Sequence, residues 1–377
     1  MKLNPVDGIV YITMRLIKRF FDSRLTAIEY FNPTLVKRIL IISSTALGDT
    51  LLSTPAIAAV RRRYPDAKIS ALIHTNYLEL FITNPHIDEF IPYYGGYKKF
   101  LVTVLRLRKL NPDTALILHG NEPQATPLAY LSGAGFIFKI PIPSQYGFLL
   151  SNHTNGFSDS PWQHHATSVR LKTASFADCK EDDLRMVLPV SEEDSDTVKR
   201  MLQILGLESR YILIGFQPGA ALNYKMWPQS NFTALGKKLV ELNPNVRIII
   251  TGSKAEKTLC TKIAADIGQS AVPLCGEFPL KSLGALIKEL FVLVTNDTGT
   301  MHVAIATGTK TVSLFCPSYY WGVGRAYDFH LHKVIFKEQP CDPCVTKKCK
   351  DPHCMELISV DEVFSAVKEF LSENSDI

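Results

Sequence analysis

The sequence lacks the patterns that mark several large classes of protein. It contains no run of about 18 uninterrupted apolar residues, so no helix that spans a membrane is predicted. It has neither the G-x-x-x-x-G-K-[ST] of a P-loop nor the G-x-S-x-G of a hydrolase with a nucleophilic serine. The segments SGAGF and GVGRAY each lack the third glycine of a dinucleotide-binding loop. The sequence therefore gives no support to these four classes.

A signal peptide is not predicted either, although the amino terminus carries the short apolar run GIVYITM. Basic residues follow this run, and no small-residue cleavage site is present. We therefore predict a cytoplasmic protein. Because that compartment keeps thiols reduced, the eight cysteines are expected to be thiols or metal ligands rather than disulfides. Four of them have apolar neighbours and are predicted to lie in the core: Cys179, Cys260, Cys275 and Cys316.

Positive charge is concentrated near the amino terminus. Residues 1–38 hold seven Lys or Arg against three acids, a net of +4, and the whole chain carries +5. The remainder is near neutral, which argues against a broad nucleic-acid-binding surface. Apolar residues recur at helical spacing in this segment, at Val10, Met14, Ile17 and Phe21, with Arg15, Lys18 and Arg19 on another face. Such a helix either lies on an anionic membrane or packs on its own domain, and both interpretations stay open.

From residue 37 the sequence alternates between predicted strands and helices in two successive series. This alternation predicts parallel strands joined by helical crossovers, and 377 residues are enough for two domains. A shift in composition near residues 180–196 indicates a linker. We predict an α/β protein with two Rossmann-like domains that face each other across a cleft. The expected segments are an amino-terminal extension (1–36), two domains (37–188 and 189–340), and a cysteine-rich loop with a final helix (341–377).

A polar cluster follows the predicted strand FVLVT and opens the next helix. It consists of Asp297, Thr298, Gly299, Thr300 and His302. The amino terminus of a helix attracts anions through its N–H groups and dipole, and a glycine lets the backbone approach a ligand. The alternative is that Asp297 and Thr298 only cap the helix. Capping needs a single such residue, so the cluster favours a site for a phosphate-bearing ligand.

Other strand ends carry further candidates. Lys225 follows Gly219 in the loop after the strand ILIGF and is a suitable point charge for a diphosphate, or else an ordinary solvated lysine. Gly252 begins the loop after the strand NVRIIIT. Asp49 lies at a loop-to-helix turn after Gly48. It is either an N-cap or a carboxylate that deprotonates a hydroxyl.

The tail CDPCVTKKCKDPHC contains four closely spaced cysteines. They follow the pattern C-x2-C-x4-C-x4-C and are Cys341, Cys344, Cys349 and Cys354. Four thiolates can hold zinc or iron tetrahedrally, and the alternative is a loop of reduced thiols. A metal here would be structural, since the tail lies outside the motifs at the strand ends.

Three motifs in order along residues 37–318 resemble glycosyltransferase family 9, the ADP-heptose:lipopolysaccharide heptosyltransferases. They are TALGDTLLSTPA, KMWPQSNF and NDTGTMHVAIATGTKTVSLFCPS. The resemblance implies a GT-B fold with an acceptor-binding first domain, a nucleotide-sugar-binding second domain and an inverting, metal-independent transfer. It implies that Asp49 is the general base and that Lys225 contacts the donor phosphate. Asp297, Thr298, Gly299 and His302 match the donor-site motif D-[ST]-G-x-x-H.

The function that this resemblance implies is transfer of a heptose from ADP-heptose to a lipopolysaccharide inner-core acceptor. No catalytic cofactor is expected. The partners would be the nucleotide sugar and a lipid-linked saccharide at the inner membrane, where the enzyme can attach peripherally. The loop TGSKAEK offers only Glu256 to the nucleoside ribose, and Ala220 and Ala221 replace hydroxyl residues, so other donors stay open. The alternatives are a transferase for another nucleotide sugar, a non-catalytic nucleotide-sugar-binding protein, and an epimerase.

Overall fold

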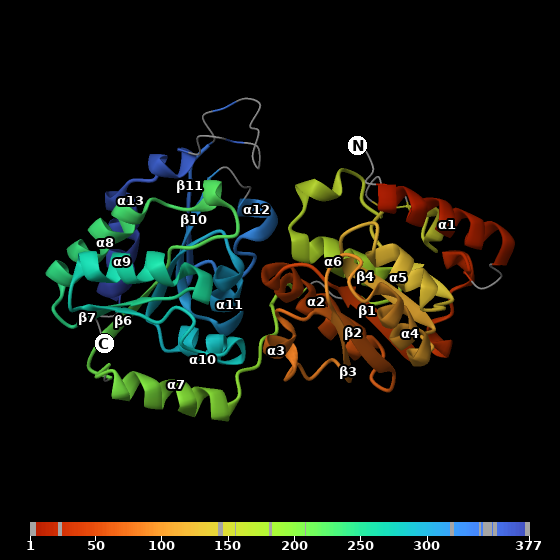
Figure 1. Ribbon diagram of the computed structural model, residues 1–377, viewed down its shortest axis with the longest axis horizontal. Coiled ribbons are helices and arrows are strands. Elements are labelled where there is room, and N and C mark those ends of the chain that lie inside the picture. Colours follow the sequence, from red (N-terminus) through yellow and green to blue (C-terminus); the bar gives the residue numbers. More distant parts are fainter. Residues whose placement is uncertain are drawn as a thin grey trace. The chain divides into compact units, whose positions relative to one another are not determined.

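The computed structural model describes residues 5–21, 25–141, 146–154, 156–180, 183–207, 209–316, 320–338, 341, 349 and 353–373. The chain divides into two compact units, Met1–Val187 and Leu188–Ile377. Each unit is a parallel sheet covered by helices (Figure 1). None of the helices in the described ranges is long and apolar enough to cross a bilayer.

The first unit is built on a five-stranded parallel sheet in the order β3-β2-β1-β4-β5. Its central strands are apolar runs, and β1 (RILIIS) is buried at every position except the first. Such strands are typical of parallel sheets that have helices on both faces. The strands are β1 (Arg38–Ser43), β2 (Lys68–His74), β3 (Glu89–Tyr93), β4 (Thr114–His119) and β5 (Phe136–Phe138).

Helices cover this sheet and hold its loops. α2 (Leu47–Arg63) packs against α6 (Ala166–Ser175). α4 (Phe100–Leu110) and α5 (Ala125–Leu131) place buried residues such as Leu107 and Leu128 in an apolar cluster with the sheet. The shorter elements are α3 (Leu78–Phe81) and four 3₁₀ turns: Ile28–Tyr30, Pro33–Leu35, Gly147–Leu149 and Pro161–Gln163.

The amino-terminal helix α1 (Pro5–Phe21) packs on the outside of the first unit (Figure 1). Its Met14 is buried in a cluster with Tyr146 and Leu149, against which Val10 and Ile17 also pack. The residues Val10, Met14 and Ile17, which follow the predicted helical spacing, therefore form the face by which α1 packs on its own domain. The packing interpretation is confirmed for that face.

The second unit is built on a six-stranded parallel sheet in the order β11-β10-β9-β6-β7-β8. The strands are β6 (Ile212–Gln217), β7 (Val246–Ile250), β8 (Ala271–Pro273), β9 (Val292–Asn296), β10 (Lys310–Phe315) and β11 (His332–Phe336). The helices are α7 (Glu192–Ile204), α8 (Gln229–Leu242), α9 (Lys257–Ile267), α10 (Leu283–Lys288), α11 (Gly299–Thr307), α12 (Tyr320–Val323) and α13 (Val360–Glu373). The described residues of this unit also contain four 3₁₀ turns: Asn223–Lys225, Lys254–Glu256, Leu280–Ser282 and Cys354–Leu357.

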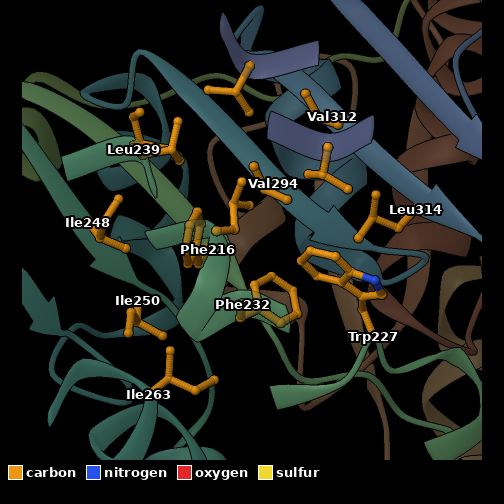
Figure 2. Close-up of a cluster of buried hydrophobic side chains, with 14 of the residues drawn as sticks. Phe216, Trp227, Phe232, Leu239, Ile248, Ile250, Ile263, Val294, Val312 and Leu314 are labelled. Atoms are coloured by element: carbon orange, nitrogen blue, oxygen red, sulfur yellow. The ribbon is translucent and has the colours of Figure 1, made fainter. Parts of the chain in front are cut away.

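Three aromatic residues, Phe216, Trp227 and Phe232, pack together within the largely aliphatic core of the second unit (Figure 2). The ring of Trp227 meets Phe232 edge-on at 5.0 Å between centroids, and Phe216 lies 5.5 Å from Phe232. The indole Nε1–H of Trp227 donates to the carbonyl of Ile358 over 2.9 Å, just before α13. This bond satisfies the one polar group of a side chain that is otherwise fully buried. It also ties the carboxyl-terminal segment to the loop that carries Lys225.

Both sheets share one pattern of connections. From β1 the chain moves outward through β2 and β3 and returns to β4 beside β1, and from β6 it moves through β7 and β8 and returns to β9. Ligands of such sheets bind outside the carboxyl ends of the strands where the order reverses. The reversals lie between β1 and β4 and between β6 and β9. The prediction of two Rossmann-like α/β domains is confirmed.

One prediction about the cysteines is wrong. Cys260 of α9 and Cys275, after β8, form a disulfide, although all eight cysteines were expected to be thiols or metal ligands. Both half-cystines are buried, as are Cys179 and Cys316, so the core placement of these four residues is confirmed. The pairing depends on the packing of α9 against β8, a tertiary contact for which the sequence offers no signal.

Candidate active site

The first candidate site lies at the carboxyl end of β1. This strand ends at Ser43, and α2 begins at Leu47 with Asp49 as its third residue. The N-cap position is taken by Ala46, whose side chain makes no capping bond. Asp49 is therefore not the N-cap that the sequence left open. Its side chain remains 30% exposed, so a ligand can reach the carboxylate.

Three polar side chains surround the Asp49 carboxylate. Arg170 of α6 donates from Nη2 to Oδ1 over 3.0 Å, and Thr45 donates its hydroxyl to Oδ2 over 3.1 Å. Arg170 is only 2% exposed and also donates from Nε to the Ser53 hydroxyl over 3.0 Å. Burial lowers the pKa of Arg170, and the adjacent Asp49 carboxylate opposes that shift. The carboxylate is thus held in one orientation by a buried guanidinium.

His119, the last residue of β4, completes this cluster. Its Nδ1 lies 2.6 Å from the Thr45 hydroxyl, and its Nε2 lies 3.5 Å from Asp49 Oδ1. Because Thr45 directs its single proton to Asp49, Nδ1–H must be the donor to Thr45, and Nε2 is left as an acceptor. Burial and the charge of Arg170 lower the pKa of His119 to about 4, although Asp49 acts in the opposite direction. At neutral pH two proton acceptors, a carboxylate and an imidazole nitrogen, therefore lie side by side.

The second candidate site lies at the carboxyl ends of β6, β7 and β9, which are neighbours in the sheet. The Lys225 ammonium pairs with the Asp297 carboxylate, so two of the predicted donor residues are in direct contact. Asn296 orders the loop between them. Its side chain donates to the Pro218 carbonyl over 2.8 Å and accepts from the Trp227 backbone N–H over 3.0 Å. The lysine thus lies in a loop that is tied to the strand carrying the aspartate.

The amino terminus of α11 belongs to the same edge of the sheet. The helix begins at Gly299, and its N-cap Thr298 makes no side-chain capping bond. Asp297 is 9% exposed and His302, in the first turn of the helix, is 5% exposed. Thr298, Gly299 and Thr300 are half-buried. Because the first N–H groups of a helix have no intrahelical partner, this end suits an anion beside the Lys225 ammonium.

Two glycines and a glutamate meet beside this end. A Cβ on Gly219 would lie 1.5 Å from Glu256 Oε1, and a Cβ on Gly252 would lie 3.2 Å from Glu256 Oε2. Oε2 also accepts from the backbone N–H of Ser253 over 2.6 Å and from its hydroxyl over 2.8 Å. The loops after β6 and β7 therefore need glycine for the carboxylate to fit between them. The Glu256 carboxylate thus lies against both of the predicted glycines, Gly219 and Gly252.

The structure brings together the predicted donor residues and adds two residues that sequence reasoning missed. Arg170 sits in the helical segment HHATSVRLKTASFA, where nothing distinguishes it from a surface arginine. His119 ends the apolar strand ALILH, and a polar residue at a strand end is the one signal that could have found it.

The four-cysteine tail lies only partly within the described residues. Cys341 is exposed, Cys349 is half-buried and Cys354 is buried, while Cys344 is outside the described residues. No cluster of three or more His, Cys, Asp or Glu side chains suited to a metal occurs in the described part of the chain. A structural metal at this tail stays a prediction.

Comparison with known proteins identifies the family. The sequence model of glycosyltransferase family 9 (heptosyltransferase) matches residues 139–355, more than half of the chain. The chain belongs to this family. Lipopolysaccharide heptosyltransferase 2 of Salmonella typhimurium is 25% identical over 300 residues, which cover 74% of this chain and 83% of that protein. The predicted family and enzyme class, glycosyltransferase, are confirmed.

Solved structures agree on the fold. The glycosyltransferase family 9 protein of Veillonella parvula has a TM-score of 0.75 at 22% identity and covers 93% of this chain and 100% of its own. The ADP-heptose lipopolysaccharide heptosyltransferase II of E. coli has a TM-score of 0.73 at 22% identity, covering 90% of this chain and 99% of its own. The GT-B fold of this family-9 glycosyltransferase is confirmed.

Proposed function

We propose that this glycosyltransferase moves a heptose from ADP-heptose to an inner-core acceptor of lipopolysaccharide, with inversion and without a catalytic metal. The observation that carries the proposal is Asp49, held by buried Arg170 beside the unprotonated Nε2 of His119. The names of similar proteins support the sugar and the acceptor class. On this proposal the first unit binds the acceptor and the second unit binds the nucleotide sugar.

The proposed reaction needs one base and one site for the leaving group. Asp49 takes the proton of an acceptor hydroxyl, whose oxygen forms a bond to the anomeric carbon of the heptose. The bond from that carbon to the diphosphate oxygen breaks, and ADP leaves with the electron pair. The transition state has oxocarbenium character, as in glycoside hydrolysis. Arg170 does not touch the substrate and acts as a positioning residue for Asp49.

The second unit supplies the groups for the departing diphosphate. Lys225 and the N–H groups near Thr298 and Gly299 place positive charge where negative charge develops. Fixed donors of this kind can replace a divalent cation. Glu256, between Gly219 and Gly252, is the carboxylate available to the ribose hydroxyls of the nucleoside. His302, in the first turn of α11, completes the set of donor-binding residues.

Binding and transfer assays test the proposal separately. We expect ADP and ADP-heptose to raise the melting temperature of the full chain more than GDP, UDP or dTDP, since a ligand of the native state stabilises it by mass action. Lys225→Ala should weaken ADP binding at least ten-fold, whereas the matched exposed variant Lys237→Ala should not. Asp49→Asn should keep ADP affinity within about two-fold and lose transfer by a factor of about 100 or more.

The possible outcomes separate the alternatives. Preference for another nucleotide would keep the enzyme class and change the donor. Binding without transfer to any acceptor would favour a non-catalytic nucleotide-sugar-binding protein. Unchanged transfer in the presence of EDTA is expected, and loss of transfer would contradict metal independence. Elemental analysis of the full chain, compared with Cys341→Ser/Cys344→Ser, tests the structural zinc or iron.

The acceptor implies a location. A lipid-linked saccharide is held by the bilayer, so we propose that the enzyme works in the cytoplasm and attaches peripherally to the cytoplasmic face of the inner membrane.

A further inference from the structure

The amino-terminal helix α1 exposes a second apolar face. Met14 faces the domain, but five apolar residues on the other side are between 44% and 66% exposed: Val6, Ile9, Ile12, Leu16 and Phe20. Their spacing of three and four residues places them in one stripe along the helix. Single exposed apolar residues are normal on a protein surface, whereas a continuous stripe marks an interaction site. The helix is therefore apolar on both the attached side and the outer side.

Helix α4 adds a second group of exposed apolar residues. Leu101 is 75% exposed, Leu105 is 63% exposed and Val102 is 45% exposed. One hydrogen bond links the loop before α4 to the first turn of α1, because the Tyr97 hydroxyl donates to Asp7 Oδ1 over 2.7 Å. We call the eight exposed apolar residues of the two helices the α1–α4 face.

Positive charge surrounds this face. In residues 5–21 and 94–110 together, the cations are Arg15, Lys18, Arg19, Lys98, Lys99, Arg106, Arg108 and Lys109. The one acidic residue of these two segments is Asp7, which accepts the Tyr97 hydroxyl. Arg15 is held at the edge of α1, with its guanidinium carbon 4.5 Å from the centroid of Phe148 and its Nη2 2.8 Å from the Tyr11 hydroxyl.

We propose that the α1–α4 face docks on a bilayer that contains anionic phospholipid. Interfacial helices bury an apolar stripe at the level of the acyl chains and keep basic residues at the headgroups. The combination of eight cations with one engaged acid favours a lipid surface over a second copy of this equally basic surface. The inference rests on the proposed function in one respect, that a lipid-linked acceptor gives docking a purpose. The exposed residues and their charge stand without it.

The test is sedimentation of the purified full chain with vesicles. We expect binding to vesicles of phosphatidylcholine mixed with phosphatidylglycerol, weak binding to phosphatidylcholine alone, and release by salt. Each Lys or Arg near an anionic surface strengthens binding by roughly five-fold. The variant Lys98→Gln/Lys99→Gln/Arg106→Gln should therefore weaken binding at least ten-fold. Its matched control is Lys199→Gln/Lys237→Gln/Lys288→Gln, which removes three exposed cations of the second unit and should change binding by less than about two-fold.

A second pair of variants tests the apolar stripe. Ile12→Gln/Leu16→Gln should also weaken vesicle binding at least ten-fold. The control Ile204→Gln/Leu242→Gln changes two exposed apolar residues elsewhere, 81% and 43% exposed, and should bind as the unmodified chain does. All four variants alter exposed side chains, so circular dichroism should show unchanged folding.

The outcomes decide between docking and its competitors. Absence of binding to anionic vesicles, or equal losses in the controls, would overturn the proposal. So would a dimer that Ile12→Gln/Leu16→Gln dissociates while vesicle binding is unaffected, since the face would then join two copies. Activity separates this proposal from the catalytic one. Transfer to a water-soluble acceptor without vesicle binding would refute docking alone, and vesicle binding without any transfer would refute the proposed function alone.

Discussion

Replacing Asp49 by alanine removes the proposed base and also leaves Arg170 buried without its carboxylate. The pair is close, at 3.0 Å, and the Arg170 side chain is 3% exposed against 30% for Asp49. Removing one partner of a buried ion pair typically costs about 3–5 kcal/mol of stability. Because Asp49 is partly in water, we expect the lower end, about 3 kcal/mol, for Asp49→Ala. Loss of activity in this variant alone would therefore not separate chemistry from folding.

A double-mutant cycle separates the two effects. Arg170→Met keeps most of the side-chain volume and removes the charge, so Asp49→Ala/Arg170→Met contains no uncompensated buried ion. We expect the double variant to be more stable than Asp49→Ala, with a coupling energy of at least about 2 kcal/mol. Transfer should stay abolished, since the base is still missing. Urea unfolding of the full chain and a transfer assay measure the two quantities.

The exposed pair Arg38–Asp113 is the matched control. Its atoms are 3.2 Å apart, and its side chains are 44% and 30% exposed. Exposed ion pairs contribute about 1 kcal/mol or less, so the cycle of Arg38→Met with Asp113→Ala should show correspondingly weak coupling. Additive effects at Asp49 and Arg170 would refute the reasoning about the buried pair. Substantial transfer by the double variant would refute the assignment of Asp49 as base.

Three further predictions concern His119, Gly219 and Trp227. The pKa of His119 lies at about 4 in the folded protein, below its ordinary 6.5. Between these two pH values the unfolded state therefore binds more protons than the folded state, so the free energy of unfolding decreases as the pH falls. His119→Gln should make that loss less steep in urea titrations at several pH values, whereas exposed His330→Gln should not. Gly219→Ala would put its Cβ 1.5 Å from Glu256 Oε1. It should weaken ADP binding in calorimetry at least ten-fold, unlike Gly322→Ala, where the space is open. Trp227→Phe removes the bond to the Ile358 carbonyl and leaves a cavity, so it should cost about 2–3 kcal/mol in urea unfolding. The Trp321 side chain is 45% exposed, so Trp321→Phe should lower the free energy of unfolding by less than about 0.5 kcal/mol.

The fold class was predictable because it depends on local patterns. Apolar runs such as RILIIS alternate with helical segments, and burial of such runs on both faces requires a parallel sheet with helices on either side. The donor residues were predictable for a related reason. They follow strands, and parallel strands bring their carboxyl ends to one edge. Asp297, Gly299 and Lys225 could therefore be grouped without knowledge of any contact.

The environment of each candidate residue could not be predicted. Arg170 bonds to Asp49 across 121 residues of sequence, and Lys225 pairs with Asp297 across 72. Periodicity records which side of an element is buried and carries no information about which distant residue lies opposite. The Cys260–Cys275 disulfide was mispredicted because the expectation came from the cellular compartment, which carries no information about which cysteines the fold brings together.

Helix α1 shows the same division of information. Its sequence determined that the segment is helical, with apolar and basic residues on different sides. Only the tertiary structure decided that Met14 faces the domain while Ile9, Ile12 and Leu16 remain exposed, because the packing partners Tyr146 and Leu149 lie more than a hundred residues away in the chain.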